Sequence, residues 1–315
     1  MPTTVAPARV SIVRDFLTGN EWSAATTRDV FALAANVKSH PARYAKALTG
    51  RYLAMIFEKP SLRTRTTYDI GMQSLGGGAV FLDNTQTRLG ERESIRDVAK
   101  NLERWVHCIT ARTFTQASIE ELAENARIPV INALSDRYHP CQGLTDFFTL
   151  EERFTTLRGL TLAYVGDGNN VCHSLMLAAS RVGAHVKIGT PAGYEPAADV
   201  VAEARAAAID TGSQFELFHS AEQAVAGAQA VYTDVWASMG QEEEAAERAR
   251  IFAPFQINEK LMQQAAPDAV FMHCLPAHRG LEVTAEVIDS PRSLAYDQAE
   301  NRLHVQKAIL LTLLS

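Results

Sequence analysis

The fold is decided by the stretch LTLAYVGDGNNV, residues 160–171. Its first six residues form an apolar strand, and the glycines, acid and asparagines that follow indicate a tight turn at the carboxyl end of that strand. Similar apolar runs lie at 52–57, 79–82, 108–111, 129–132, 185–188, 215–218, 230–235 and 269–273. Segments with helical spacing of apolar residues separate them, as at 95–105, 119–126 and 200–209. This alternation predicts right-handed βαβ units and parallel sheets covered on both faces.

Length indicates how these strands are divided. A chain of 315 residues is expected to form two domains, so nine strands predict two doubly wound sheets of four or five strands each. A helical stretch at 147–159 is the expected seam, and the chain crosses again near 289–291 before a long helix at 294–314. We therefore predict a first domain over 1–147 and a second over 148–291, with the segment 292–315 packing back onto the first.

Composition excludes several classes of protein. With 30 Lys+Arg against 36 Asp+Glu and a net charge of −6, the chain lacks the basic stripe of a nucleic-acid-binding surface. Apolar runs such as 160–165 and 308–314 are too short to cross a bilayer, and residues 1–15 do not resemble a secretory signal. The four cysteines form no CxxC pair, which predicts neither a zinc knuckle nor a disulfide framework and favours a reducing cytoplasm.

Polar residues cluster where several strands end, which is where doubly wound folds bind ligands. After strand 52–57, Pro60 and Ser61 signal a helix start, and Arg63, Thr64 and Arg65 follow in its first turn. Helix N-termini and guanidinium groups both bind phosphate, so this junction predicts an anion site. Because residues two apart on a helix diverge, Arg63 and Arg65 cannot both face one ligand. The alternative is a capped helix with solvated arginines.

Two more strand ends in the first half add donors. Arg112 closes strand 108–111; on its own it is most often a salt-bridge partner. His139 precedes Pro140 and so is expected at a helix start, where its neutral imidazole could donate to a carbonyl oxygen. Gln142, one turn later, can share that face.

The second half supplies different groups. The stretch 166–171 resembles a dinucleotide fingerprint, but Val171 replaces the third glycine and the next strand ends in Thr190 without an acid, which weakens the case for a nicotinamide-dependent dehydrogenase. Asp234 could bind an ammonium group. Cys274 is either a buried small hydrophobe or a functional thiol. Together the two halves predict a two-substrate transferase with its site in the cleft between domains.

Six stretches closely resemble the signatures of the ornithine branch of the transcarbamoylase family. They are FEKPSLRTR (57–65), HPCQ (139–142), GDGNNV (166–171), DVWASMG (234–240), HCLPAHRG (273–280) and DQAENRLHVQKAIL (297–310). The resemblance implies a carbamoyl phosphate domain, an ornithine domain, and the reaction of carbamoyl phosphate with L-ornithine to give L-citrulline and phosphate in arginine biosynthesis. It implies homotrimers with sites at subunit interfaces, and no metal or cofactor.

The resemblance also implies site residues. Those for carbamoyl phosphate are Ser61, Leu62, Arg63, Thr64, Arg88, Arg112, His139, Gln142, Cys274, Leu275 and Arg302. Those for ornithine are Asn170, Asp234, Ser238 and Met239. The catalytic groups among them are Arg112, His139 and Cys274.

Two of these positions depart from the family pattern. Leu62 replaces a threonine and would contribute only its backbone N–H. Arg88 stands where the family more often has Gln, His or Met, in a loop that reaches a neighbouring subunit's site, where it would contact phosphate in trans.

The sequence is also compatible with rival functions. Sister transcarbamoylases act on putrescine, N-acylated ornithine or aspartate, and Asp234 with the asparagines and 238–240 instead suits a free amino acid head group. A non-catalytic binding protein of the same fold would not need both halves of the site. The sequence leaves open the biosynthetic or catabolic direction, cooperativity, assembly beyond a trimer and the proton acceptor for the attacking amine.

Overall fold

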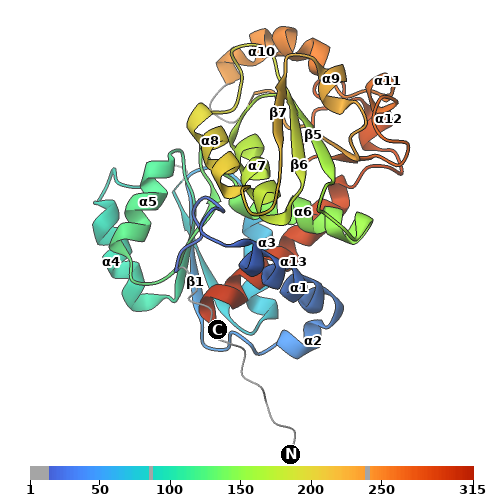
Figure 1. Ribbon diagram of the computed structural model, residues 1–315. Helices are drawn as coiled ribbons and strands as arrows, with labels where there is room; N and C mark the ends of the chain where they lie inside the picture. The colour runs from blue at the N-terminus through green and yellow to red at the C-terminus, as the bar shows by residue number, and fades with distance from the viewer. Residues whose placement is uncertain (1–13, 85–87, 238–241) are drawn as a thin grey trace, which may run out of the picture.

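The computed structural model describes residues 14–84, 88–237 and 242–315, and the strands in these ranges form two parallel sheets (Figure 1). The first sheet has the order β2-β1-β3-β4 and the second the order β7-β6-β5-β8-β9. The strands are β1 (Tyr52–Phe57), β2 (Gly78–Asp83), β3 (Cys108–Arg112), β4 (Val130–Leu134), β5 (Thr161–Val165), β6 (His185–Gly189), β7 (Phe215–Phe218), β8 (Ala230–Tyr232) and β9 (Val270–Met272). Each order reverses beside an inner strand, so both sheets are doubly wound and the predicted fold class is confirmed.

Most strands lie within one residue of the predicted ends, and two differ by more than that at one end, for local reasons. β8 ends at Tyr232 rather than 235, because the Thr233 hydroxyl donates to the Val165 carbonyl (2.7 Å) as the chain leaves the sheet. β4 continues to Leu134 rather than ending at 132, and its pairing with β3 shifts register between Ala111 and Arg112. The sequence pattern marks an apolar run well but not the point where hydrogen bonding ends.

The helices fall between the strands as the alternation predicts. They are α1 (Ala24–Ser39), α2 (Pro41–Tyr44), α3 (Leu62–Ser74), α4 (Ile95–Trp105), α5 (Gln116–Asn125), α6 (Pro140–Phe154), α7 (Asn170–Val182), α8 (Ala198–Ala207), α9 (Ala221–Val225), α10 (Ala245–Phe252), α11 (Glu259–Met262), α12 (Ala285–Ile288) and α13 (Ala295–Leu314). α5 starts earlier than the apolar spacing indicates, because Thr115 caps it by accepting from the Ser118 N–H. None of the helices in the described part of the chain is long and apolar enough to cross a membrane.

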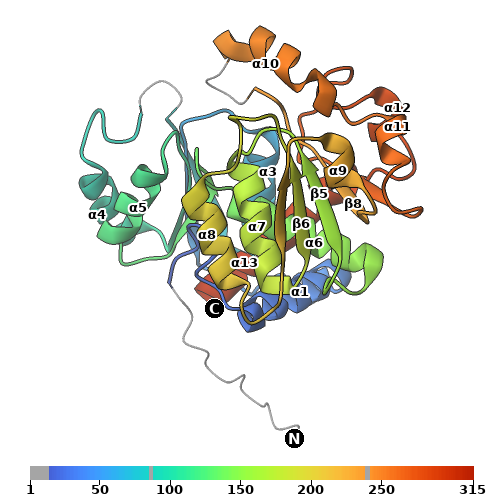
Figure 2. The ribbon, with the colours of Figure 1, turned by 45° about the horizontal axis from the view of Figure 1, so that its top comes forward.

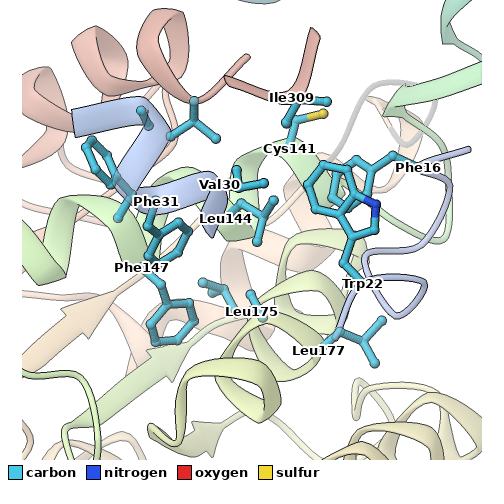
Figure 3. Packing of buried hydrophobic residues seen from close by; sticks show 14 of the residues in the cluster. Phe16, Trp22, Val30, Phe31, Cys141, Leu144, Phe147, Leu175, Leu177 and Ile309 are labelled. Carbon is cyan, nitrogen blue, oxygen red and sulfur yellow. The ribbon is translucent and has the colours of Figure 1, made fainter. Parts of the chain in front are cut away.

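An apolar core lies between the two sheets and joins them. Figure 3 shows Leu144 and Phe147 of α6 meeting Val30 and Phe31 of α1 and Leu175 of α7. Burying each such side chain contributes about 1.5–3 kcal/mol. We call each sheet with its covering helices a lobe. The two lobes are therefore held together by a continuous apolar core rather than by a linker alone.

Helix α13 connects the lobes from below. It packs against α1, α3 and α6, and Figure 1 shows it running diagonally from the lobe of β5 towards the lobe of β1. Figure 2 shows α1 and α13 on the side of the molecule opposite α10. The domain boundaries at 147/148 and 291/292 stay a prediction.

The close approach of α6 and α7 predicts a stability effect. A Cβ added at Gly143 would lie 2.6 Å from the Ser174 carbonyl oxygen. Gly143→Ala should therefore force the helices apart and lower the free energy of unfolding by about 1–3 kcal/mol, measured by urea unfolding. Gly71→Ala is the matched control in α3, since its Cβ would meet Lys307 Cγ at an ordinary 3.4 Å. Alanine there should stabilise by about 0.5–1 kcal/mol, and equal stability of the two variants would contradict the packing argument.

Candidate active site

The site lies where the inner strands of both sheets end. In the first sheet the order reverses between β1 and β3, and in the second between β5 and β8. Ligands of doubly wound folds bind at such reversals, outside the carboxyl ends of the strands. The segments that begin at Ser61, Arg112, Asn169 and Asp234 follow these four strand ends directly or close the strand. Two reversal points thus contribute to a single site.

The start of α3 forms one wall of the site. Ser61 is the N-cap residue, but within the described chain its hydroxyl does not cap the helix and so is available to a ligand. The positive end of the helix dipole and the backbone N–H groups of the first turn favour an anion here. Leu62 has 77% of its surface exposed, so at that position only the backbone can serve the site. This geometry agrees with the expectation for a helix-start anion site.

Arg302 of α13 binds two other elements at once. Its Nη1 donates to Gln142 Oε1 (2.8 Å) in α6, and its Nη2 donates to Thr64 Oγ1 in α3. All three side chains are buried. A residue 160 positions from Gln142 thus completes the polar wall, as the resemblance implies.

Two further arginines gather beside Arg302. Burial, with Arg302 and Arg63 nearby, lowers the pKa of Arg112 to about 10. Burial also lowers the pKa of Arg63, which lies close to Cys274 and Asp234. Arg65 instead stacks over the Phe81 ring at 3.7 Å, so the predicted divergence of the two arginines is confirmed. No ion pair in the described structure neutralises Arg63, Arg112 or Arg302, and their mutual repulsion favours a bound anion.

His139 occupies the N-cap of α6, as its position before Pro140 predicts. Its ring is buried, and burial together with the nearby arginines holds the pKa of His139 well below its ordinary value. Its Nδ1 is buried without a hydrogen-bond partner among the described residues. A neutral imidazole beside guanidinium groups can bind a carbonyl or amide of a substrate.

Asp234 and Cys274 meet on the side of the second sheet. The Cys274 thiol donates to Asp234 Oδ1 (3.2 Å), and Asn169 Nδ2 donates to Asp234 Oδ2 (3.0 Å). Burial and the Asp234 charge raise the pKa of Cys274 well above its ordinary value, so the thiol keeps its proton. Of the four cysteines, Cys274 is the one that is not fully buried. The structure thus supports the functional alternative for this thiol.

Other predicted residues lie around this group rather than within it. Asn170 donates to the Ser135 carbonyl (2.6 Å), and the Leu275 N–H donates to His273 Nδ1 (2.9 Å). The Arg88 guanidinium lies 4.4 Å from the centre of the Phe114 ring, which Lys59 also approaches at 4.6 Å. Ser238 and Met239 lie outside the described residues.

Two polar residues near the site went unrecognised by the sequence reasoning. Asp146 Oδ1 accepts from Gln142 Nε2 (2.7 Å), and burial raises the pKa of Asp146 to about 7. Its spacing of four residues from Gln142 was a usable signal, because such residues share a helix face. Glu58 accepts from the Leu89 and Phe114 N–H groups (2.6 and 2.7 Å) and so joins the loops after β2 and β3. Nothing in the sequence indicates those contacts.

One group of potential metal ligands lies at the site. Donor atoms of Asp234, His273 and Cys274 lie within 4.8 Å of one another. Both nitrogens of His273 already face protein groups, with the Leu275 N–H on Nδ1 and Glu282 at 3.3 Å from Nε2. The geometry therefore fits a hydrogen-bonded network better than a set of free metal ligands.

Comparison with known proteins agrees with this geometry. Residues 14–152 match the model for the carbamoyl-P binding domain of aspartate/ornithine carbamoyltransferase, and residues 158–313 match the model for its Asp/Orn binding domain. The anabolic ornithine carbamoyltransferase of Pyrococcus furiosus is 48% identical over 98% of this chain and 97% of its own. The ornithine carbamoyltransferase of Anoxybacillus flavithermus is 50% identical over 96% of each chain.

Solved structures show the same likeness. The ornithine carbamoyltransferase structure from Pyrococcus furiosus superposes with a TM-score of 0.92 over 96% of this chain and 97% of that chain, at 48% identity. The structure from Thermus thermophilus gives 0.87 over 96% and 99%, at 46% identity. With both domain models matched and such relatives, the chain belongs to the aspartate/ornithine carbamoyltransferase family.

Proposed function

We propose that this enzyme transfers the carbamoyl group of carbamoyl phosphate to the δ-amine of L-ornithine, releasing L-citrulline and phosphate, in arginine biosynthesis. One observation carries the proposal: guanidinium groups without an ion pair among the described residues lie at the end of the first sheet and close to a thiol–carboxylate pair at the end of the second. The first set suits a phosphate and the second an amino acid. The relative from Pyrococcus furiosus is described as anabolic, which supports the biosynthetic direction.

Carbamoyl phosphate would bind against the first sheet. Arg63, Ser61 and the N–H groups at the start of α3, including that of Leu62, would hold the phosphate, which must leave as an anion. Arg112, His139 and Thr64 would donate to the carbonyl oxygen as it becomes an oxyanion in the tetrahedral intermediate. Gln142 Oε1, which already accepts from Arg302, has a second lone pair for the substrate's NH2 group.

Ornithine would bind against the second sheet. Asp234 would pair with its α-ammonium group, aided by Asn170 and by Ser238 and Met239, which follow Asp234 in the sequence. The δ-amine must lose its proton before attack, although an alkyl ammonium has a pKa of about 10.4. Arg63 disfavours a second cation near Cys274, and this repulsion favours the neutral amine. Cys274 would contact the amine as a protonated thiol, and the Leu275 carbonyl would complete the pocket.

We further propose a homo-oligomer, a trimer by family resemblance, located in the cytoplasm. A hollow of about 650 Å³ lies between α4 and the neighbouring strands β1 and β2, of which β2 is the edge strand. Its lining is mostly apolar, and it includes the exposed side chains of Tyr52, Val80 and Trp105. Exposed apolar patches of this kind mark protein interfaces, and a second copy of the chain is the occupant we favour. Arg88 follows β2 at the same edge, which supports its proposed contact with a neighbour's phosphate.

Substituting Arg63 tests the phosphate assignment. Arg63→Ala should raise the KM for carbamoyl phosphate roughly 10- to 100-fold, because a charged hydrogen-bonding group is lost, while the ornithine KM changes little. Citrulline formation is the assay, with putrescine, acetylornithine and aspartate compared as acceptors. Arg65→Ala is the matched control, because Arg65 lies two residues further along α3 but stacks on Phe81. Equal effects of the two substitutions on the KM for carbamoyl phosphate would contradict the assignment of Arg63 to the phosphate.

The raised pKa of Cys274 predicts slow alkylation. At pH 8 iodoacetamide should modify Cys274 at least about tenfold more slowly than a free thiol, because less thiolate is present. Asp234→Asn removes the negative charge, lowers the thiol pKa and should accelerate modification several-fold. Peptide mass spectrometry measures both rates. A slower reaction in Asp234→Asn would contradict the thiol–carboxylate contact.

Charge in the apolar hollow should break the assembly. Trp105 has 68% of its surface exposed, and Trp105→Glu would place a carboxylate in the proposed interface. We expect sedimentation to show monomers and citrulline formation to fall. Ile209→Glu is the control: Ile209 follows α8 and has 80% of its surface exposed, and this substitution should leave the mass unchanged. An unchanged mass in Trp105→Glu would rule out this face.

A further inference from the structure

A single carboxylate oxygen lies between the two halves of the site. Asp146 Oδ1 accepts from Gln142 Nε2 (2.7 Å) within α6 and from Gln298 Nε2 (2.8 Å) in α13. All three residues are buried. Each amide therefore has its NH2 side fixed by the same atom.

The carbonyl oxygens of the two amides accept from groups on different sides of the site, one proposed to bind carbamoyl phosphate and the other ornithine. Gln142 Oε1 accepts from Arg302 Nη1 (2.8 Å), on the carbamoyl phosphate side. Gln298 Oε1 accepts from the backbone N–H of His273 (2.8 Å), directly before Cys274. A chain of hydrogen bonds thus runs from Arg302 through Asp146 to the loop that holds the thiol.

This series of hydrogen bonds fixes the orientation of the Gln142 side-chain amide. An amide can rotate by half a turn and exchange its donor and acceptor ends at little cost in volume. With Nε2 held by Asp146, Gln142 presents an acceptor to the site. A rotated amide would present NH2 groups to Arg302 and to the substrate's own NH2 group, and both contacts would be donor against donor.

We propose that Asp146 is a positioning residue, which through Oδ1 aligns Gln142 for carbamoyl phosphate and the loop of Cys274 for ornithine. The proposal rests on the proposed function, since it concerns how that site is held. One atom, Asp146 Oδ1, thereby holds both halves through Gln142 and Gln298.

Groups from α13, from β8 and from the segment after β9 face the Asp146 carboxyl. Gln298 and Arg302 of α13 and Tyr232 of β8 favour its ionised form, as Gln142 does, but burial outweighs them and raises the pKa of Asp146 to about 7. Cys274 is the fourth neighbour, and the Asp146 charge contributes to its raised pKa. Asparagine resembles the neutral acid in shape and retains an oxygen that can accept from both amides. Asp146→Asn is therefore the conservative variant.

A second polar contact between the same helices provides a control. Asn301 Nδ2 of α13 donates to Thr149 Oγ1 of α6 (3.0 Å), and both residues are buried. Thr149 and Asn301 are 152 residues apart in the sequence, as are Asp146 and Gln298. Their hydrogen bond, however, involves neither Gln142 nor the segment of Cys274. Thr149→Ala therefore removes a comparable helix contact without touching the hydrogen-bond chain.

The experiment measures steady-state citrulline formation, thermal unfolding and Cys274 alkylation in the presence of carbamoyl phosphate, for the wild type and for each variant. Asp146→Ala should raise the KM for carbamoyl phosphate at least about tenfold and speed alkylation at least about threefold. Asp146→Asn should restore the KM to within about threefold of the wild type. Thr149→Ala should change neither value beyond about twofold, even where its unfolding temperature falls as far as that of Asp146→Ala.

Gln298→Ala separates the two branches of the hydrogen-bond network, one through Gln142 and the other through Gln298 itself. It should speed Cys274 alkylation while leaving the KM for carbamoyl phosphate within about threefold, because Asp146 still holds Gln142. This variant decides the matter should Asp146→Ala fail to fold, and unchanged alkylation would then overturn the proposal. If Asp146→Ala folds and behaves like Thr149→Ala while the wild type forms citrulline, positioning by Asp146 is wrong and the proposed function stands. Absence of citrulline from the wild type would instead overturn the proposed function.

Discussion

The repulsion among Arg63, Arg112 and Arg302 is the constraint on which the site depends. Two of these side chains are buried and the third is half-buried, and no carboxylate in the described ranges pairs with them. Burial and this repulsion together lower the pKa of Arg112 to about 10. Such an arrangement opposes folding, so the apolar packing of the surrounding helices must hold it in place. An entering anion relieves the repulsion, and the free energy released becomes binding energy.

The architecture explains how the site draws on both sheets and on the helices between them. Arg112 ends β3, Arg63 lies in the first turn of α3 and Arg302 in α13, so one sheet supplies only part of the set. The helices that connect the lobes bring the remainder. Because Asp234 and Cys274 come from strand ends of the second sheet, cations and acid approach from opposite sides. A nucleophile and a leaving group require this separation.

Local sequence signals predict part of this site and no more. Arg63 and His139 are found from helix-start patterns at strand ends, and alternating runs give the fold class. Strand order, and with it the partners of each strand end, depends on contacts distant in sequence. Arg302 and Gln298 sit in a uniform helical pattern, and only the packing of α13 on α6 gives them a polar role. The sequence indicates two asparagines after β5, but only the structure shows that Asn169, rather than Asn170, contacts Asp234.

The polar contacts between α6 and α13 determine how far these helices can slide. Apolar helix faces tolerate small shifts along their axes, since one methyl group can replace another. Here Gln142, Asp146 and Thr149 project from one face of α6 and each meets a particular polar partner on α13. A slip of one turn would leave several buried polar groups unpaired, at about 1–3 kcal/mol each. The two helices are therefore fixed in register along their axes, and this register keeps the strand ends of the two sheets aligned with each other.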